Sequence, residues 1–227
     1  MVSDETSPSA RSHEQRRKHF DVAQAWTNTV AGLVALALSA YNFIQLERDP
    51  EVDVALPHIV RVSQGRDVWL YLQPTVSTRL ETQQVEVVTE ARLEAHRADG
   101  DGTSPAFIWD EAGAFSYDPE AKSLTYQRVA DPSPLVVNRD KPQQPVMVFN
   151  AVGWNFTPGR YEATLTLHRT SGRNPLKSRF CLMVSDEALA LFKKTGENTF
   201  QSFRDDLPEK VANTTRSSKD CHVLAAF

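Results

Sequence analysis

A short acidic segment beside an aromatic side chain is the first place where residue types and spacing indicate chemistry. Trp109, Asp110 and Glu111 follow one another directly, and Asp118 lies a few residues further on. Paired carboxylates next to an aromatic ring can bind a sugar, and at a suitable separation they supply the acid and base of a glycoside hydrolase. The alternative is a strand followed by an acidic loop, with Trp109 partly in the core.

A second aromatic residue with a polar neighbour, Trp154-Asn155, lies in a predicted loop within residues 150–156. If this loop lies near Trp109, an exposed aromatic pair would form a binding patch. The candidate binding residues for a protein or carbohydrate ligand are Trp109, Asp110, Glu111, Trp154 and Asn155. No residue of the chain is assigned as catalytic.

Motifs for cofactors, metals and nucleic acids are missing from the sequence. The six histidines lack metal-ligand spacing, and neither Cys-x-x-Cys nor His-Glu-x-x-His occurs. A formal net charge of −4 and a pI of about 5.9 give no basic footprint for nucleic acid. We therefore expect no cofactor, no metal and no nucleic-acid partner.

An uncharged segment, residues 22–46, predicts a transmembrane helix with the lipid bilayer as its partner. Asp21 and Glu47 bracket it, and Trp26 and Tyr41 near its ends suit the membrane interface. At about 1.5 Å per residue this length crosses a hydrocarbon core of about 30 Å. A buried soluble helix and a cleaved signal peptide are the alternatives.

Basic residues set the predicted orientation of this helix. Arg11, Arg16, Arg17 and Lys18 precede it, whereas only Arg48 follows closely. The positive-inside rule then predicts a single-pass protein of the cell membrane, with its N-terminus in the cytoplasm and its domain outside.

Small and polar residues gather on one side of the predicted helix when it is projected at about 100° per residue. They include Asn28, Ala31, Gly32, Ala35, Ser39 and Asn42. In lipid, small residues let helices approach closely, and asparagine side chains hydrogen-bond between them. This stripe predicts a homo-oligomer through the helix; the alternative is an alanine-rich anchor whose polar residues mark its ends.

After residue 52 the hydrophobic period changes from helical to two. The clearest alternation runs through residues 161–167. In residues 68–72, aliphatic side chains face one way while Trp69 and Tyr71 face the other, which indicates a central strand covered on both sides. Seven to nine short strands without intervening amphipathic helices predict an all-β sandwich or barrel.

The segment Phe156–Leu167 resembles the late corner and strand of immunoglobulin-like domains. In those domains a tyrosine at the turn into this strand hydrogen-bonds back to the corner backbone, and Tyr161 occupies that position. The resemblance implies an immunoglobulin-like sandwich and no particular function. Cys181 and Cys221 do not match the inter-sheet disulfide of antibody domains, and their number fits either one disulfide or two free thiols.

These patterns divide the chain into five predicted segments. They are a disordered polar tail (1–21), the transmembrane helix (22–46), a linker (47–51), the β-sandwich domain (52–196) and a partly docked, mostly flexible tail (197–227). Ser185 and Gly196 delimit a short helix at the end of the domain.

The leading interpretation is a membrane-anchored, non-catalytic β-sandwich module that binds a protein or carbohydrate outside the cytoplasm. An oligomerising membrane effector with a cytoplasmic, ligand-sensing β domain is the first alternative. The second is an extracytoplasmic hydrolase that uses Asp110, Glu111 or Asp118.

Overall fold

In the computed structural model the chain forms two compact units, Met1–Arg48 and Asp49–Phe227. The residues that the structure describes are 8–47, 51–79, 85–100, 104–138, 142–196, 199–207 and 221–225.

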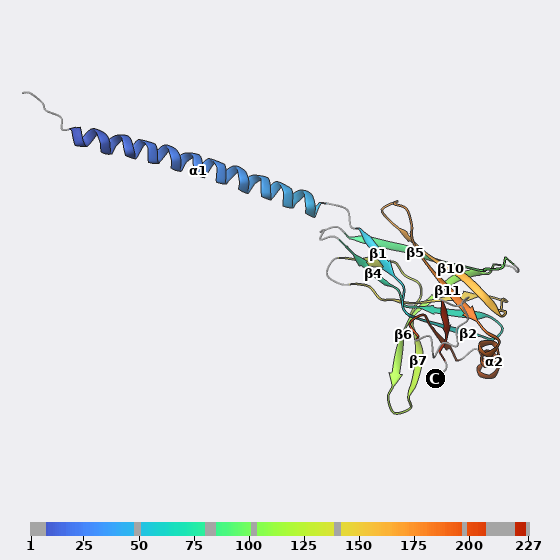
Figure 1. Ribbon diagram of the computed structural model, residues 1–227. Helices are drawn as coiled ribbons and strands as arrows, with labels where there is room; N and C mark the ends of the chain where they lie inside the picture. Colours follow the sequence, from blue (N-terminus) through green and yellow to red (C-terminus); the bar gives the residue numbers. More distant parts are fainter. Residues whose placement is uncertain are drawn as a thin grey trace, which may run out of the picture. The chain divides into compact units, whose positions relative to one another are not determined.

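The first unit contains one long helix, α1 (Pro8–Leu46) (Figure 1). Its Trp26–Leu46 part has a mean hydropathy of 1.5 and buries no side chain, so by length and composition it can cross a membrane. An N-terminal apolar helix is thereby confirmed. Because α1 begins at Pro8, it includes part of the segment 1–21 assigned above to a polar tail. Residues 1–7 of that tail and 48–50 of the linker lie outside the described residues.

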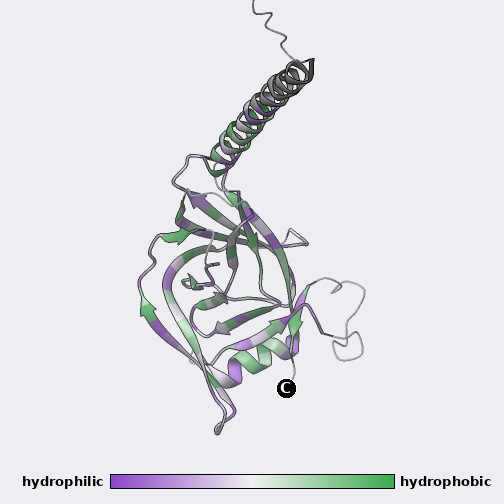
Figure 2. Ribbon diagram, turned by 90° about the vertical axis from the view of Figure 1, so that its left-hand side faces the viewer, coloured by the Kyte–Doolittle hydropathy of each residue, from purple (hydrophilic) through white to green (hydrophobic). Residues whose placement is uncertain are grey.

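Nine strands of the second unit close into a barrel. Each strand pairs with the next in the order β6-β9-β3-β2-β12-β13-β11-β10-β5, and β5 pairs again with β6. Figure 2 shows how the strands curve around a central space. The strands are β2 (Ile59–Gln64), β3 (Val68–Leu72), β5 (Glu86–Arg97), β6 (Ala106–Asp118), β9 (Val146–Ala151), β10 (Gly159–Arg169), β11 (Leu176–Val184), β12 (Gln201–Arg204) and β13 (His222–Leu224).

Four further strands lie outside this ring. Among the described strands, β7 (Ser123–Ala130) pairs with β6, β8 (Leu135–Val137) pairs with β5, and β1 (Val52–Ala55) pairs with β4 (Thr75–Thr78). The all-β prediction is confirmed, with more strands than the seven to nine expected. Since the pairing among the described strands runs continuously around a ring, the immunoglobulin-like sandwich stays a prediction.

The alternation of side chains along each strand determines which residues fill the barrel. Val62, Leu70 and Phe149 lie opposite one another on β2, β3 and β9, and at most 1% of each is exposed. Residues that alternate with them point to the outer face of the barrel. On β3 these are Trp69 and Tyr71, both half-buried, so the prediction of a central strand covered on both sides is confirmed.

The corner before β10 has the predicted tyrosine arrangement. The Tyr161 hydroxyl donates to the Thr157 carbonyl oxygen at 3.1 Å and accepts from the Thr157 amide at 3.0 Å. Tyr161 is 3% exposed, so these bonds satisfy its hydroxyl within the core. The local hydrogen bonding expected from the resemblance is confirmed.

The short C-terminal helix is confirmed as α2 (Asp186–Thr195). Ser185 caps it by accepting a hydrogen bond from the Ala188 amide at 3.2 Å. Of the segment 197–227, β12 and β13 are strands of the barrel itself, and residues 208–220 lie outside the described part. A disulfide joins Cys181 on β11 to Cys221 directly before β13.

Candidate ligand-binding site

A β-bulge on β6 separates the side chains of the acidic segment. Trp109 lies opposite Phe149 and Glu111 lies opposite the adjacent Val148, so Asp110 is the extra residue. Trp109 consequently packs against the core, and its Nε1 donates to the Glu111 carbonyl oxygen at 3.2 Å. Glu111 turns to the outer face of the barrel with 15% of its side chain exposed, while Asp110 is exposed.

Trp154 and Asn155, the second pair of candidate residues, do not join Glu111. Trp154 is half-buried and makes edge-to-face contacts with Phe156 and Phe107, at centroid distances of 4.7 and 6.0 Å. Asn155 is exposed. Among the described residues no ring contact joins Trp154 to Trp109. Of the five candidate residues, only Glu111 lines the pocket between β3, β6 and β7.

Glu111 lies in a pocket of about 620 Å³ on the outer face of the barrel. The lining residues come from β3, β6, β7 and the segment before β12; they are Trp69, Tyr71, Glu111, Leu124, Thr125, Tyr126, Thr199 and Phe200. Four of the eight are aromatic, and Glu111 is the one carboxylate. A pocket of this size accommodates a small ligand or part of a chain-like one.

Strand register explains why Tyr71 and Glu111 share this face. Both lie opposite Val148, from the two strands that flank β9. Val148 itself is completely buried although it points outward, which shows that the outer face is covered at this point. Trp69, two residues before Tyr71, extends the aromatic surface along β3.

The β6–β7 hairpin, which extends from the barrel in Figure 1, carries Glu111, Leu124, Thr125 and Tyr126 of the pocket lining. The Tyr126 ring lies 5.0 Å from that of Tyr71 and 5.7 Å from that of Phe115. Phe200, from the segment before β12, lies 5.5 Å from Phe115 and 5.8 Å from Tyr71. These tilted and edge-to-face contacts hold the rings at fixed angles, so the wall is preorganised.

Gly113 permits the close approach of Tyr126. A Cβ atom at this position would lie 2.3 Å from the Tyr126 ring. We expect Gly113→Val to displace the ring and to lower the free energy of unfolding by about 1–3 kcal/mol, measured by urea titration. Ala114→Val, at the neighbouring exposed position, is the control and should change stability little. Equal stability of the two variants would contradict this role of Gly113.

Burial dominates the electrostatics of the pocket. It raises the pKa of Glu111, while Arg128, with its Nε 3.5 Å from Glu111 Oε2, lowers it and Asp110 raises it further. Burial also raises the pKa of Tyr126, with the charge of Glu111 as a second cause, and that of Tyr71. Both tyrosines are therefore neutral hydroxyls at neutral pH.

A guanidinium group packs against the same aromatic cluster. Arg61 Cζ lies 4.1 Å from the centroid of the Phe115 ring and 5.8 Å from that of Phe200. Burial lowers the pKa of Arg61. The rings beside the pocket thus already bind one organic cation within the fold.

Trp109 lines a second hollow, of about 730 Å³, where β5 and β6 diverge. The two strands pair only at Leu93 and Glu94 on β5. The charged side chains Glu90 and Arg92 beside this hollow are already paired with each other at 2.6 Å. Glu94 and His96 also line this hollow, but its aromatic rings besides His96 are Phe107 and Trp109, against four aromatic residues in the pocket around Glu111.

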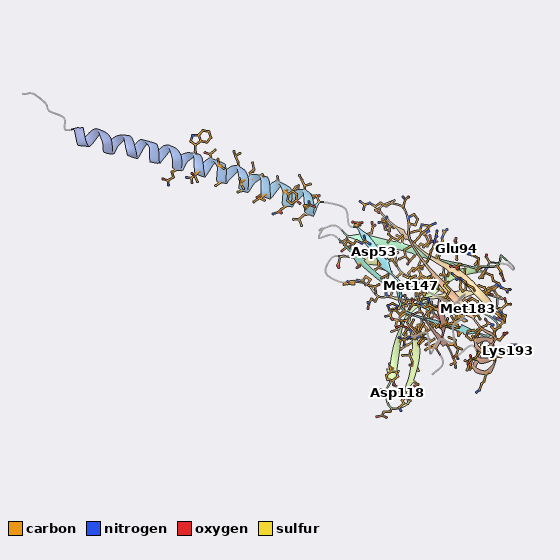
Figure 3. All side chains as sticks on the ribbon, in the orientation of Figure 1. Asp53, Glu94, Asp118, Met147, Met183 and Lys193 are labelled. Carbon is orange, nitrogen blue, oxygen red and sulfur yellow. A yellow bond between two sulfur atoms is a disulfide. The ribbon has the colours of Figure 1, made fainter. Side chains whose placement is uncertain are left out.

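Asp118, considered above for hydrolysis, has a local structural role. Its Oδ1 accepts hydrogen bonds from the Glu120 and Ala121 amides at 2.9 and 3.0 Å, which stabilises the turn between β6 and β7. Figure 3 shows Asp118 at the outer end of this hairpin, well away from Met147 of the barrel. Among the described residues, no group of three histidine, cysteine or acidic side chains could hold a metal ion.

The six residues of the predicted association stripe all lie on α1, and all are exposed. They are Asn28, Ala31, Gly32, Ala35, Ser39 and Asn42. Apart from the two neighbouring residues and the backbone of the helix itself, no described heavy atom lies within 4 Å of the position of a Cβ on Gly32. The stripe is thus exposed among the described residues, and its association stays a prediction.

Four of the functional candidates, Trp69, Tyr71, Tyr126 and Phe200, were missed in the sequence. The available signal was the placement of Trp69 and Tyr71 opposite the aliphatic face of one strand. Tyr126 and Phe200 carry no such signal, because they reach the pocket only through the hairpin and through the segment before β12.

The structure thus defines a chain with one helix able to cross a membrane, joined to a β-barrel domain with an aromatic pocket around one carboxylate. No protein-family model matches this chain, and the comparison with curated proteins gave no match.

Proposed function

We propose that this chain is a membrane-anchored, non-catalytic module that binds a carbohydrate outside the cytoplasm through the pocket around Glu111. The observation that carries the proposal is the lining of this pocket, in which four aromatic side chains surround one carboxylate. Aromatic rings pack against the apolar faces of sugar rings, and a carboxylate accepts hydrogen bonds from their hydroxyl groups.

The number of carboxylates in the pocket favours binding over hydrolysis. Most glycoside hydrolases need two converging carboxyl groups, about 5–10 Å apart. Of the described lining residues only Glu111 is acidic, and Asp118 is used in a turn. The hydrolase alternative therefore has weaker support than the binding module.

The disulfide favours the outside location of the domain. Disulfides persist in oxidising compartments and are rare in the cytosol. Cys181 and Cys221 are joined, and the basic residues before the helix independently favour a cytoplasmic N-terminus. Both observations count against the cytoplasmic effector alternative.

The immunoglobulin-like sandwich is retained as a hypothesis about the fold. It is supported by the Tyr161 hydroxyl, which bonds back to Thr157 at the corner before β10. A two-sheet sandwich becomes a continuous ring when strands join the two sheets at both edges. Here β13 would join them at one edge and the β5–β6 pairing at the other.

The proposal is tested by titrating the full-length chain, in lipid nanodiscs, with an array of oligosaccharides. We expect binding by the wild type and at least a tenfold loss with Trp69→Ala. Tyr117→Ala is the control, because Tyr117 is a 60% exposed aromatic residue on the β6–β7 hairpin and does not line the pocket. Binding to no oligosaccharide, or equal losses in both variants, would refute the proposal.

Association of the anchor is a separate part of the function. We expect the double substitution Ala35→Leu and Ser39→Leu to abolish self-association, because bulky side chains prevent the close approach of two helices. A membrane two-hybrid assay measures this, with Leu36→Ala and Leu38→Ala, on exposed positions outside the stripe, as the control. Undiminished association of the Leu variant would exclude the stripe as the contact surface.

A further inference from the structure

Resting on the proposed carbohydrate-binding function, we infer that the ligand of this pocket is an amino-sugar glycan whose protonated amine binds the Glu111 carboxylate. The pocket combines aromatic faces with a single, largely buried negative charge. An organic ammonium group satisfies both features at once, whereas a neutral sugar satisfies only the first.

The first argument is the state of Glu111. Its side chain is 15% exposed and shares the pocket with Trp69, Tyr71 and Tyr126. A carboxylate in such surroundings has lost much of its hydration, which is why its pKa lies above its ordinary value. A cation bound next to the carboxylate replaces more of this lost hydration energy than a neutral hydroxyl group does.

The second argument is the behaviour of the aromatic cluster. Phe115 and Phe200 already accommodate the Arg61 guanidinium, at 4.1 and 5.8 Å from Cζ to the ring centroids. Phe200 also lines the pocket, together with Tyr71 and Tyr126, which contact the same cluster. Rings of this kind attract a cation placed over their faces.

The charges around Glu111 leave room for a ligand cation. Arg128 lies 3.5 Å from Glu111, yet its side chain is 61% exposed, does not line the pocket and also pairs with Asp131. The carboxylates of Glu111, Asp110 and Asp131 outnumber Arg128 and the stacked Arg61 by three to two. Without Glu111 the two signs balance, so the net negative charge of this group is that of Glu111 itself.

The affinity should depend on pH in a definite direction. Glu111 is faced by Arg128, Asp110, Tyr126 and Tyr71, and its pKa is raised. Lowering the pH through that pKa protonates Glu111 while the amine of the ligand stays charged. Affinity for an amino sugar should therefore fall as the pH falls, and affinity for a neutral sugar should change little.

The test compares β-1,4-linked tetrasaccharides of glucosamine, N-acetylglucosamine and glucose, titrated into the full-length chain in nanodiscs at neutral pH. We expect the glucosamine tetramer to bind at least tenfold more tightly than the two neutral tetramers. Glu111→Gln should remove this preference and leave the neutral affinities unchanged. Asp110→Asn, the exposed neighbour outside the pocket, should keep it, and unfolding temperatures of both variants verify their folding.

The outcomes separate the inference from the proposed function. Equal binding of all three tetramers to the wild type would overturn the amino-sugar inference and leave the carbohydrate module intact. A preference that survives in folded Glu111→Gln would also overturn it. Binding of no carbohydrate in the wider array would refute the proposed function itself.

Discussion

Replacing both cysteines with serine should lower the free energy of unfolding by about 4 kcal/mol. This is the free energy expected when a disulfide restricts the unfolded chain by closing a loop between residues 40 positions apart. Urea unfolding of the domain measures this change. The loss should be large because the disulfide attaches β13, which is the strand that joins β12 to β11 in the ring. Without it, a three-residue strand must hold the barrel closed.

Chemical reduction gives the matched control for this prediction. A reductant should destabilise the wild type by about the same amount and leave the double serine variant unchanged. His222, directly after Cys221, is 3% exposed and contacts the carbonyl oxygens of Cys181 and Pro57 at 3.3 and 3.1 Å. Stability unaffected by reduction would mean that such contacts alone secure β13.

Glu86→Ala should be comparably severe, with a loss of about 3–5 kcal/mol in the free energy of unfolding. Glu86 is 3% exposed; its Oε2 accepts from Ser171 Oγ at 2.7 Å and lies 3.9 Å from Arg169 Nη1. Arg169 is 9% exposed, so removal of the carboxylate leaves a buried guanidinium without its counter-charge. Thermal and urea unfolding measure the loss.

Two controls distinguish this buried pair from a surface pair. Glu90→Ala removes a carboxylate 2.6 Å from Arg92, with both side chains about half exposed or more, and should change stability little. Adding Arg169→Leu to Glu86→Ala should recover part of the lost stability, because no unpaired charge then remains buried. Equal losses from Glu86→Ala and Glu90→Ala would contradict the account.

The elements that local sequence determines were predictable. Residue alternation predicted the strands β3 and β10, Ser185 and Gly196 delimited α2, and Tyr161 indicated its own corner hydrogen bonds. Each of these signals depends on residues within a few positions of one another, so a single sequence carries it completely.

The ring closure and the pocket depend on contacts between distant segments. β13 pairs with β11, which lies about 40 residues earlier in the chain. β13 has three residues, and neither this length nor its composition predicts a strand of the barrel. The bulge at Asp110 reverses the direction of Glu111 relative to Trp109, which alternation alone cannot reveal. Sequence reasoning therefore found the carboxylate of the site and missed the aromatic residues around it.

The cysteines illustrate the same limit. Their number allowed one disulfide or two free thiols, and Cys221 lay in a segment expected to be mostly flexible. The structure joins it to Cys181 because β13 runs parallel to β11 and places the two residues side by side. Spacing along the chain holds no information about that register.

The most direct test of the central claim combines protease shaving of intact cells with alkylation of free thiols, on a full-length, C-terminally tagged chain analysed by mass. The account predicts an uncleaved, membrane-bound chain whose domain is digested from outside and whose Cys181 and Cys221 resist alkylation until reduction. A domain protected from protease, with both thiols alkylated, would contradict it and favour the cytoplasmic effector.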